Sequence, residues 1–149
     1  MKTPLLITVV FLCLLFSCKK DTTTNNTCAK TVANIAGTYS PVKNEISMMN
    51  ASFADITSQW QPCERDDKLI LNANGIYTYQ DLGISCTPSG NSSGTWSISS
   101  PDGKFTINDT GSAQDITNAD ITSFDCSTLV LTGDVSTGTG TRFRLTLKK

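Results

Sequence analysis

Polar and apolar residues alternate in short runs along this chain, which is typical of β-strands. The clearest run lies near the C-terminus, where Phe143, Leu145 and Leu147 alternate with Arg142 and Arg144. Successive side chains of a strand point to opposite faces of a sheet. We therefore expect a sheet whose apolar face is turned inward and whose charged face is in contact with water.

Turn residues separate eight runs of this kind. Residues 72–75 (Asn-Ala-Asn-Gly) predict a hairpin, because an Asn-Gly pair tolerates positive φ. Residues 101–103 (Pro-Asp-Gly) predict a second hairpin turn. Evenly spaced hairpins favour an all-β fold, an antiparallel up-and-down barrel of about eight strands. The expected strands cover residues 36–40, 68–71, 76–79, 94–98, 104–107, 116–124, 129–131 and 142–147.

The segment between Asn44 and Trp60 departs from the strand period. Its apolar residues are spaced three and four apart, as on one face of a helix, and Asn44 or Ser47 could cap the N-terminus. We expect one short helix between the first and second strands. It would cover the core or act as a lid with Met48 nearby. The residues with helical spacing are Ile46, Met49, Phe53, Ile56 and Trp60.

The first twenty residues carry an export signal. Lys2 precedes an uncharged apolar stretch over residues 5–16, and Ser17 follows it. This order is the secretory signal pattern, and the stretch is shorter than the about 20 apolar residues of a membrane-spanning helix. Leu15-Phe16-Ser17-Cys18 resembles the lipobox of bacterial lipoproteins, which implies that Cys18 is lipidated and becomes the mature N-terminus. An ordinary signal peptide with an incidental cysteine is the alternative.

The lipobox divides the chain into three parts. We expect a signal peptide over residues 1–17, a lipidated cysteine and flexible polar tether over 18–32, and one domain over 33–149. Lys19 stands where the best-known sorting rule has an inner-membrane aspartate. This favours a lipid anchor in the outer membrane of a Gram-negative bacterium, on its periplasmic or cell-surface face.

Charge and composition exclude several functions. Removal of residues 1–17 leaves 132 residues with 11 Lys plus Arg against 13 Asp plus Glu, so no basic excess points to nucleic acid. The chain has no histidine, which removes His-based catalytic triads and His metal sites. Glu64, Asp66 and Asp67 form the one acidic cluster, and a solvated strand start explains it. We predict no enzyme activity, no cofactor and no metal.

The cysteines test the barrel topology. With Cys13 in the signal and Cys18 lipidated, four remain, and four cysteines permit three pairings. Zinc ligands come in close pairs, whereas these are 35, 23 and 40 residues apart, so we expect disulfides. The four are Cys28, Cys63, Cys86 and Cys126.

The first hairpin favours one of the three pairings. Asn74, near its centre, lies eleven residues after Cys63 and twelve before Cys86, which brings the two thiols to the same level at its open end. The other pair is then Cys28 with Cys126. Cys28 precedes the first strand and Cys126 lies in the turn after the sixth, and an up-and-down barrel places both at one end.

In its order of motifs the chain resembles the lipocalin-like domain of Gram-negative lipoproteins. The resemblance covers about residues 33–149 and implies a small barrel with an internal cavity, without an assigned reaction. Lipocalins open with Gly-x-Trp, whereas Tyr39 takes the third position here. The matching residues are Gly37-Thr38-Tyr39, Trp60, Cys63-Glu64-Arg65-Asp66-Asp67, Leu69, Leu71, Gly75-Ile76-Tyr77, Cys86, Gly94-Thr95-Trp96 and Leu129-Val130-Leu131.

Two functions follow from this resemblance. The first is a binding module that holds a small hydrophobic or amphipathic ligand in the barrel mouth, since eight strands leave room for side chains or for one small ligand. The second is an envelope or cell-surface interaction protein with a filled barrel, which meets a protein partner through loops 83–93 and 136–140. In that case the candidate ligand contacts complete the core. These contacts are Met49, Phe53, Trp60, Tyr77, Tyr79 and Trp96.

Overall fold

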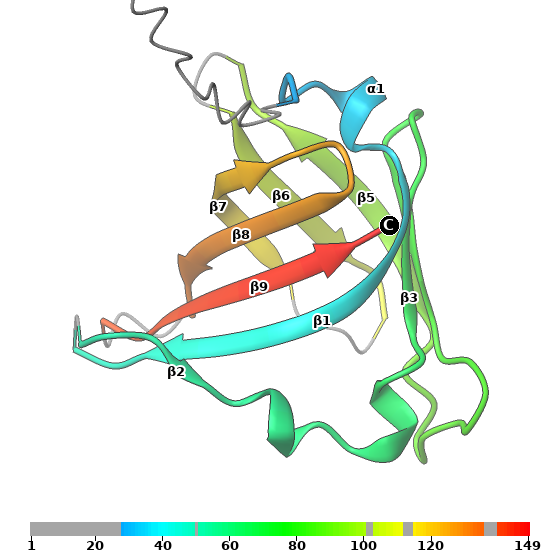
Figure 1. The fold of residues 1–149 in the computed structure, drawn as a ribbon. Coiled ribbons are helices and arrows are strands. Elements are labelled where there is room, and N and C mark those ends of the chain that lie inside the picture. The colour runs from blue at the N-terminus through cyan, green and yellow to red at the C-terminus, as the bar shows by residue number, and fades with distance from the viewer. Residues whose placement is uncertain (1–27, 50, 101–102, 112–114, 136–139) are drawn as a thin grey trace, which may run out of the picture.

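The computed structural model describes residues 28–149 except 50, 101–102, 112–114 and 136–139 (Figure 1). The expected signal peptide, the lipidation site at Cys18 and most of the tether lie outside the described residues, as does part of the 101–103 turn. The elements are α1 (Val32–Ile35), β1 (Gly37–Ser47), β2 (Ala54–Asp55), the short 3-10 helices η1 (Thr57–Gln59) and η2 (Pro62–Glu64), β3 (Lys68–Leu71), β4 (Ile76–Gln80), β5 (Ser92–Ile98), β6 (Lys104–Asp109), β7 (Ile116–Phe124), β8 (Thr128–Asp134) and β9 (Arg142–Lys148).

The strands form a closed antiparallel barrel. From β3 to β9 each strand pairs with the next, and β9 returns to pair with β1, which also pairs with β3 (Figure 1). Eight strands close the barrel, and β2 is a two-residue addition at the edge of β1. The fold class expected from the strand periodicity is confirmed. The Asn-Gly hairpin between β3 and β4 is also present, with Gly75 at φ 86°.

β1 pairs with two different barrel strands along its length. Residues 37–39 pair with β3, whereas residues 40–47 pair with β9, and the register shifts between Pro41 and Lys43. Proline has no amide hydrogen to donate, so in sheets it is confined to edges, strand starts and bulges. β1 therefore leaves β3 after Tyr39, and β2, η1 and η2 follow at the lower end of Figure 1.

The expected helix over residues 44–60 is wrong. The structure extends β1 to Ser47 and follows it with β2, η1 and η2, while the short helix α1 precedes β1 instead of following it. The apolar residues spaced three and four apart therefore do not share one face of a helix. The pairing of residues 40–47 with β9 closes the barrel, and this long-range ladder overrides a local helical pattern.

The core fills the α1 end of the barrel. Tyr39 is fully buried and its hydroxyl donates to the Ile35 carbonyl oxygen at 2.6 Å. Trp96 packs against Phe105, with ring centroids 5.8 Å apart. Inward positions of all eight barrel strands contribute to this cluster. Its buried members are Ile35, Tyr39, Leu69, Leu71, Tyr77, Trp96, Phe105, Ile107, Ala119, Ile121, Phe124, Leu129, Leu131 and Leu147.

A disulfide joins the N-terminal segment to the α1 end. Cys28 is bonded to Cys126, and the Cys28 amide donates to the Phe124 carbonyl oxygen at 3.1 Å. Thr31, which caps α1, also follows this attachment. These residues were expected in the tether, so the part of the chain held by the barrel begins earlier than residue 33.

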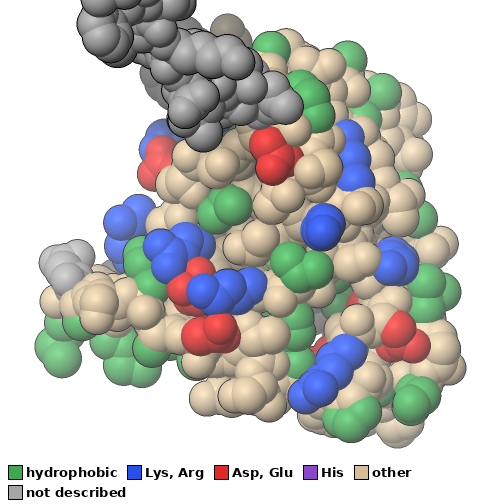
Figure 2. All heavy atoms as spheres, in the orientation of Figure 1, with side chains coloured by type: hydrophobic (Ala, Val, Ile, Leu, Met, Phe, Trp, Pro, Cys, Tyr) green, Lys and Arg blue, Asp and Glu red, His purple; other side chains and the backbone are tan. Residues whose placement is uncertain are grey.

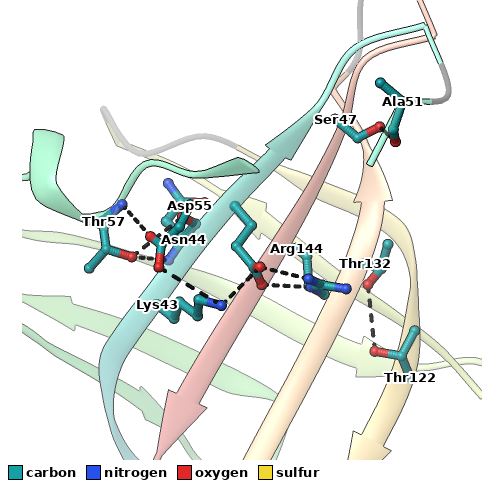
Figure 3. A network of polar contacts seen from close by, with 10 residues as sticks. Lys43, Asn44, Ser47, Ala51, Asp55, Thr57, Thr122, Thr132 and Arg144 are labelled. Atoms are coloured by element: carbon teal, nitrogen blue, oxygen red, sulfur yellow. Dashed lines mark hydrogen bonds and ion pairs between the residues drawn. The ribbon is translucent and has the colours of Figure 1, made fainter. Parts of the chain in front are cut away.

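Charged side chains cover the outer face of β1, β8 and β9, where lysine, arginine, aspartate and glutamate interleave (Figure 2). Glu45 is the most buried of them, with 5% of its surface exposed. Two of the three guanidinium nitrogens of Arg144, Nε and Nη2, donate to its carboxylate at 2.6 Å, and the Lys43 ammonium lies 2.9 Å away. Figure 3 shows Arg144 and Lys43 pointing toward the same carboxylate. Phe53 covers the Arg144 guanidinium, 4.3 Å from the ring centroid.

Replacement of Glu45 tests this cluster. The Arg144 hydrogen bonds lower the pKa of Glu45 from 4.5 to about 2. A lowered pKa stabilises the fold above about pH 4.5, and this contribution disappears as the pH falls toward 2. We expect Glu45→Gln to lower the free energy of unfolding at pH 7 by about 2 kcal/mol.

Urea denaturation of both proteins between pH 7 and pH 2.5 measures this difference. It should shrink steadily below pH 4.5, and a difference that stays constant down to pH 2.5 would contradict the assignment. Asp134→Asn is the matched control, because the Asp134 carboxylate is 84% exposed and should change stability little at any pH.

Candidate ligand-binding end of the barrel

The end of the barrel opposite α1 keeps apolar side chains within reach of solvent. Phe143 and Leu145 lie on the same face of β9 as the fully buried Leu147, so they point into the barrel. Ile46 pairs with Phe143 across the β1–β9 ladder and shares this face. Ile116 begins β7 at the same end and packs against the core. All four are half-buried, whereas most core residues at the α1 end are fully buried, Ile98 being half-buried.

Glycine at position 133 makes room for one of these side chains. Gly133 pairs with Phe143, and a Cβ atom on it would come within 2.7 Å of the Phe143 ring and 3.2 Å of Ala119. The absence of a side chain at Gly133 therefore leaves the space that the Phe143 ring occupies. Phe143 thereby becomes part of the lining at this end.

Two tyrosines supply polar groups on the inner face of β4. The Tyr77 hydroxyl donates to the Asp109 carboxylate and lies 3.2 Å from Ser92 Oγ. The Tyr79 hydroxyl donates to the buried carboxylate of Asp67 at 2.9 Å. Burial raises the pKa of Tyr77 to about 12, and burial followed by the Asp67 hydrogen bond raises the pKa of Tyr79 further. Both phenols stay neutral hydrogen-bonding groups at physiological pH.

A cavity opens in the barrel wall where β1 has left β3. Its volume is about 430 Å³, within the size range of small-molecule sites. Its lining combines apolar groups (a proline, a valine and an indole ring) with two hydroxyls and one guanidinium. The lining residues are Pro41, Val42, Thr57, Ser58, Trp60 and Arg65.

Hydrogen bonds to the edge of β1 hold the first part of this wall. The Ile56 amide donates to the Asn44 carbonyl oxygen at 2.9 Å. Thr57 Oγ1 accepts from the Asn44 amide at 2.9 Å, and Figure 3 shows these two residues facing each other. The Thr57 amide donates to Asp55 Oδ1, also at 2.9 Å. Hydrogen bonds from the Thr57 side chain and then from its backbone amide lower the pKa of Asp55, so its carboxylate stays charged.

A capping box and a disulfide hold the second part. The Gln61 amide donates to the Glu64 carboxylate at 2.6 Å, and Pro62 begins η2, where a missing amide hydrogen costs nothing. Arg65 Nη2 lies 3.4 Å from the Trp60 carbonyl oxygen. The Cys63–Cys86 disulfide then joins this segment to the loop between β4 and β5.

Two buried aspartates shape that loop. Asp81 accepts hydrogen bonds from the amides of Cys86 and Gly90 at 3.1 Å, and Asp67 accepts one from Leu82 at 3.2 Å. A carboxylate that accepts several backbone amides orders the loop that carries them. Residues 57–65 and the loop after β4 therefore form one cross-linked unit at this end of the barrel.

Of the six candidate ligand contacts, only Trp60 lines the wall cavity. Tyr77 and Tyr79 face the interior from β4, as described above. Trp96 lies at the other end, 3% exposed, and its indole nitrogen donates to the Asn72 carbonyl oxygen at 2.8 Å, so it belongs to the core. Met49 is 84% exposed and Phe53 packs on Arg144 outside the barrel, because neither stands on the expected helix.

The expectation missed five of the six cavity residues. The expected helix includes Thr57 and Ser58, and Arg65 is named only among the residues that carry the family resemblance. Pro41 and Pro62 are the signals that could have found this wall, since a proline within a strand marks a bulge and a second one ends any helix that reaches Trp60. Both disulfides that the hairpin and barrel arguments favoured are present.

Among the residues that the structure describes, no group of three or more acidic or cysteine side chains could hold a metal ion. The helices in this part of the chain are all too short and too polar to span a membrane.

A comparison with protein families places this chain. Residues 35–131 match the family described as the lipocalin-like domain, so the chain belongs to the lipocalin-like family. The match begins just before β1 and ends within β8, which covers most of the barrel. No curated protein and no solved structure matches the chain.

Removal of the Cys63–Cys86 disulfide should loosen the cavity wall. We expect Cys63→Ala/Cys86→Ala to lower stability by about 3 kcal/mol through loop-closure entropy and to make Trp60 more accessible to acrylamide quenching. The matched control, Cys28→Ala/Cys126→Ala, should lower stability by about 4.7 kcal/mol because its loop is longer, yet leave Trp60 quenching unchanged. Equal quenching in both variants would contradict the structural role of Cys63–Cys86 at the cavity.

Proposed function

We propose that this chain is a membrane-anchored lipocalin-like lipoprotein that binds a small hydrophobic or amphipathic molecule at the open end of its barrel. The observation that carries the proposal is the contrast between the two ends. Most core side chains at the α1 end are fully buried, with Ile98 half-buried among them, whereas Ile46, Ile116, Phe143 and Leu145 at the other end are all half-buried. Such partly solvated apolar lining gains free energy when a ligand covers it.

The polar groups at this end suit an amphipathic ligand. Tyr77 and Tyr79 donate their neutral hydroxyls to the carboxylates of Asp109 and Asp67, so each of these polar groups is a phenol paired with an acid. Small-molecule sites are mostly apolar with a few placed polar groups, which matches this lining.

Binding is favoured over catalysis. Members of the lipocalin-like family are typically binding proteins. The acidic residues beside the open end hold backbone amides and tyrosine hydroxyls, as Asp67 and Asp81 do, and this accounts for their burial without a reaction.

The anchor fits this arrangement. With Cys18 lipidated, residues 19–27 connect the lipid to Cys28, which the disulfide to Cys126 fastens at the α1 end. Figure 1 places α1 and the open end at opposite sides of the barrel. An outer-membrane anchor would then attach to the filled end and leave the open end free to receive a ligand.

Nile red binding tests the proposed site. We expect saturable binding at micromolar dye with a blue shift of its emission, since the dye would leave water for apolar lining. Leu145→Trp adds bulk to the inner face and should weaken binding at least tenfold. The adjacent Thr146→Trp places the same side chain on the outer face and should leave binding unchanged.

Two results would contradict this proposal. Absence of saturable binding by the unaltered protein would favour the alternative of an envelope interaction protein with a protein partner. Equal weakening by Leu145→Trp and Thr146→Trp, in variants that fold normally by circular dichroism, would show that the dye does not enter the open end.

Replacement of the lipobox cysteine tests the anchor. The full chain expressed in a Gram-negative host should incorporate an alkyne-labelled fatty acid and partition into detergent, and Cys18→Ser should abolish both, because the thiol is the acylated atom. Cys13→Ser removes a thiol from the apolar stretch five residues earlier and should change neither. Labelling that persists in Cys18→Ser would exclude the lipid anchor.

A further inference from the structure

Arg65 presents a positive charge at the wall cavity that its acidic neighbours do not neutralise. None of the ion pairs among the described residues includes Arg65. Glu64 accepts from the Gln61 amide, and Asp66 accepts from the Ile84 amide at 3.4 Å. Each carboxylate thus accepts from a backbone amide and forms no ion pair with Arg65, although Asp66 Oδ1 is buried without a hydrogen-bond partner, and the guanidinium lines the cavity.

The rest of the lining contains both apolar and hydroxyl side chains. Pro41, Val42 and Trp60 offer an apolar surface, and Val42 is 43% exposed although it lies in a barrel strand. Thr57 and Ser58 add hydroxyls. Within the described residues, this surface therefore combines an exposed valine and a half-buried indole with a cation that forms no ion pair.

We propose that this wall cavity binds a small organic acid, with its apolar body against Trp60, Pro41 and Val42 and its carboxylate paired with Arg65. The planar guanidinium fork matches a carboxylate with two parallel hydrogen bonds. One guanidinium and no lysine lines the cavity, which suits a single negative charge. This site is distinct from the open end of the barrel, because its lining comes from the β1 bulge and residues 57–65.

Covalent and hydrogen bonds fix the positions of Trp60, Arg65 and Thr57 relative to β1. The Arg65 guanidinium contacts the Trp60 carbonyl oxygen, and Cys63, which lies between them in sequence, is fixed by its disulfide to Cys86. Thr57 ties the same segment to Asn44 of β1. A site with fixed walls loses less conformational entropy on binding than a flexible one.

The experiment compares 2-naphthoate with the uncharged 2-naphthamide by calorimetric titration at low salt. We expect 2-naphthoate to bind more tightly and Arg65→Gln to weaken it about tenfold, whereas 2-naphthamide binding stays the same. High salt should weaken 2-naphthoate binding as well, because Arg65 is exposed. Arg142→Gln removes the same charge on the outer face and should change neither ligand.

The outcomes separate this site from the proposed function. Nile red binding should be unaffected by Arg65→Gln, and 2-naphthoate binding should be unaffected by Leu145→Trp. Equal loss of 2-naphthoate in Arg65→Gln and Arg142→Gln would show a general charge effect and overturn the proposal. Absence of 2-naphthoate binding, with Nile red still bound, would overturn the wall site while the barrel site stands.

Discussion

The division of β1 between two neighbouring strands is the constraint on which the rest of the structure depends. Three residues pair with β3 and the remainder pairs with β9, so one strand both continues the sheet and closes it. Pro41 marks the change, because a residue without an amide hydrogen cannot keep both ladders regular. Closure gives the barrel its dry core, and the departure from β3 leaves the wall cavity beside residues 57–65.

Two kinds of bond stabilise this closure at its weak points. On the outside, Glu45 and Arg144 join β1 to β9 beneath the Phe53 ring, where little water competes for the carboxylate. At each end a disulfide fastens a segment that has no strand partner. Cys126 holds the N-terminal segment at the filled end, and Cys63 with Cys86 holds the cavity wall to the loop after β4. The α1 end is thereby fastened to the N-terminal segment, while the inward apolar side chains at the opposite end stay half-buried.

The unequal packing of the two ends connects the fold to its family. A lipocalin-like barrel of eight strands has an interior that side chains fill or that holds one small ligand. In this chain Trp96 and Phe105 fill the α1 half, and Phe143 lies beside Gly133 in the other half. The wall cavity is a second place where apolar side chains lie beside a charged one, Arg65, which contacts the Trp60 carbonyl oxygen but belongs to none of the ion pairs among the described residues.

The sequence by itself predicted the eight barrel strands, the hairpin at Asn74-Gly75 and the inward face of β9, because period-two alternation and turn chemistry are local properties, although it ended the first strand at residue 40 instead of Ser47. It also favoured the cysteine pairing: spacing along the hairpin pointed to Cys63 with Cys86, and the barrel topology placed the remaining pair, Cys28 and Cys126, at one end. Only the tertiary structure decided residues 44–60. Their apolar spacing predicts a helix, but the ladder with β9 draws Ile46 into the barrel and leaves Phe53 outside on Arg144. The cavity was beyond local reasoning for the same reason: Pro41 and Arg65 meet only after a strand pairing between opposite ends of the chain has placed them.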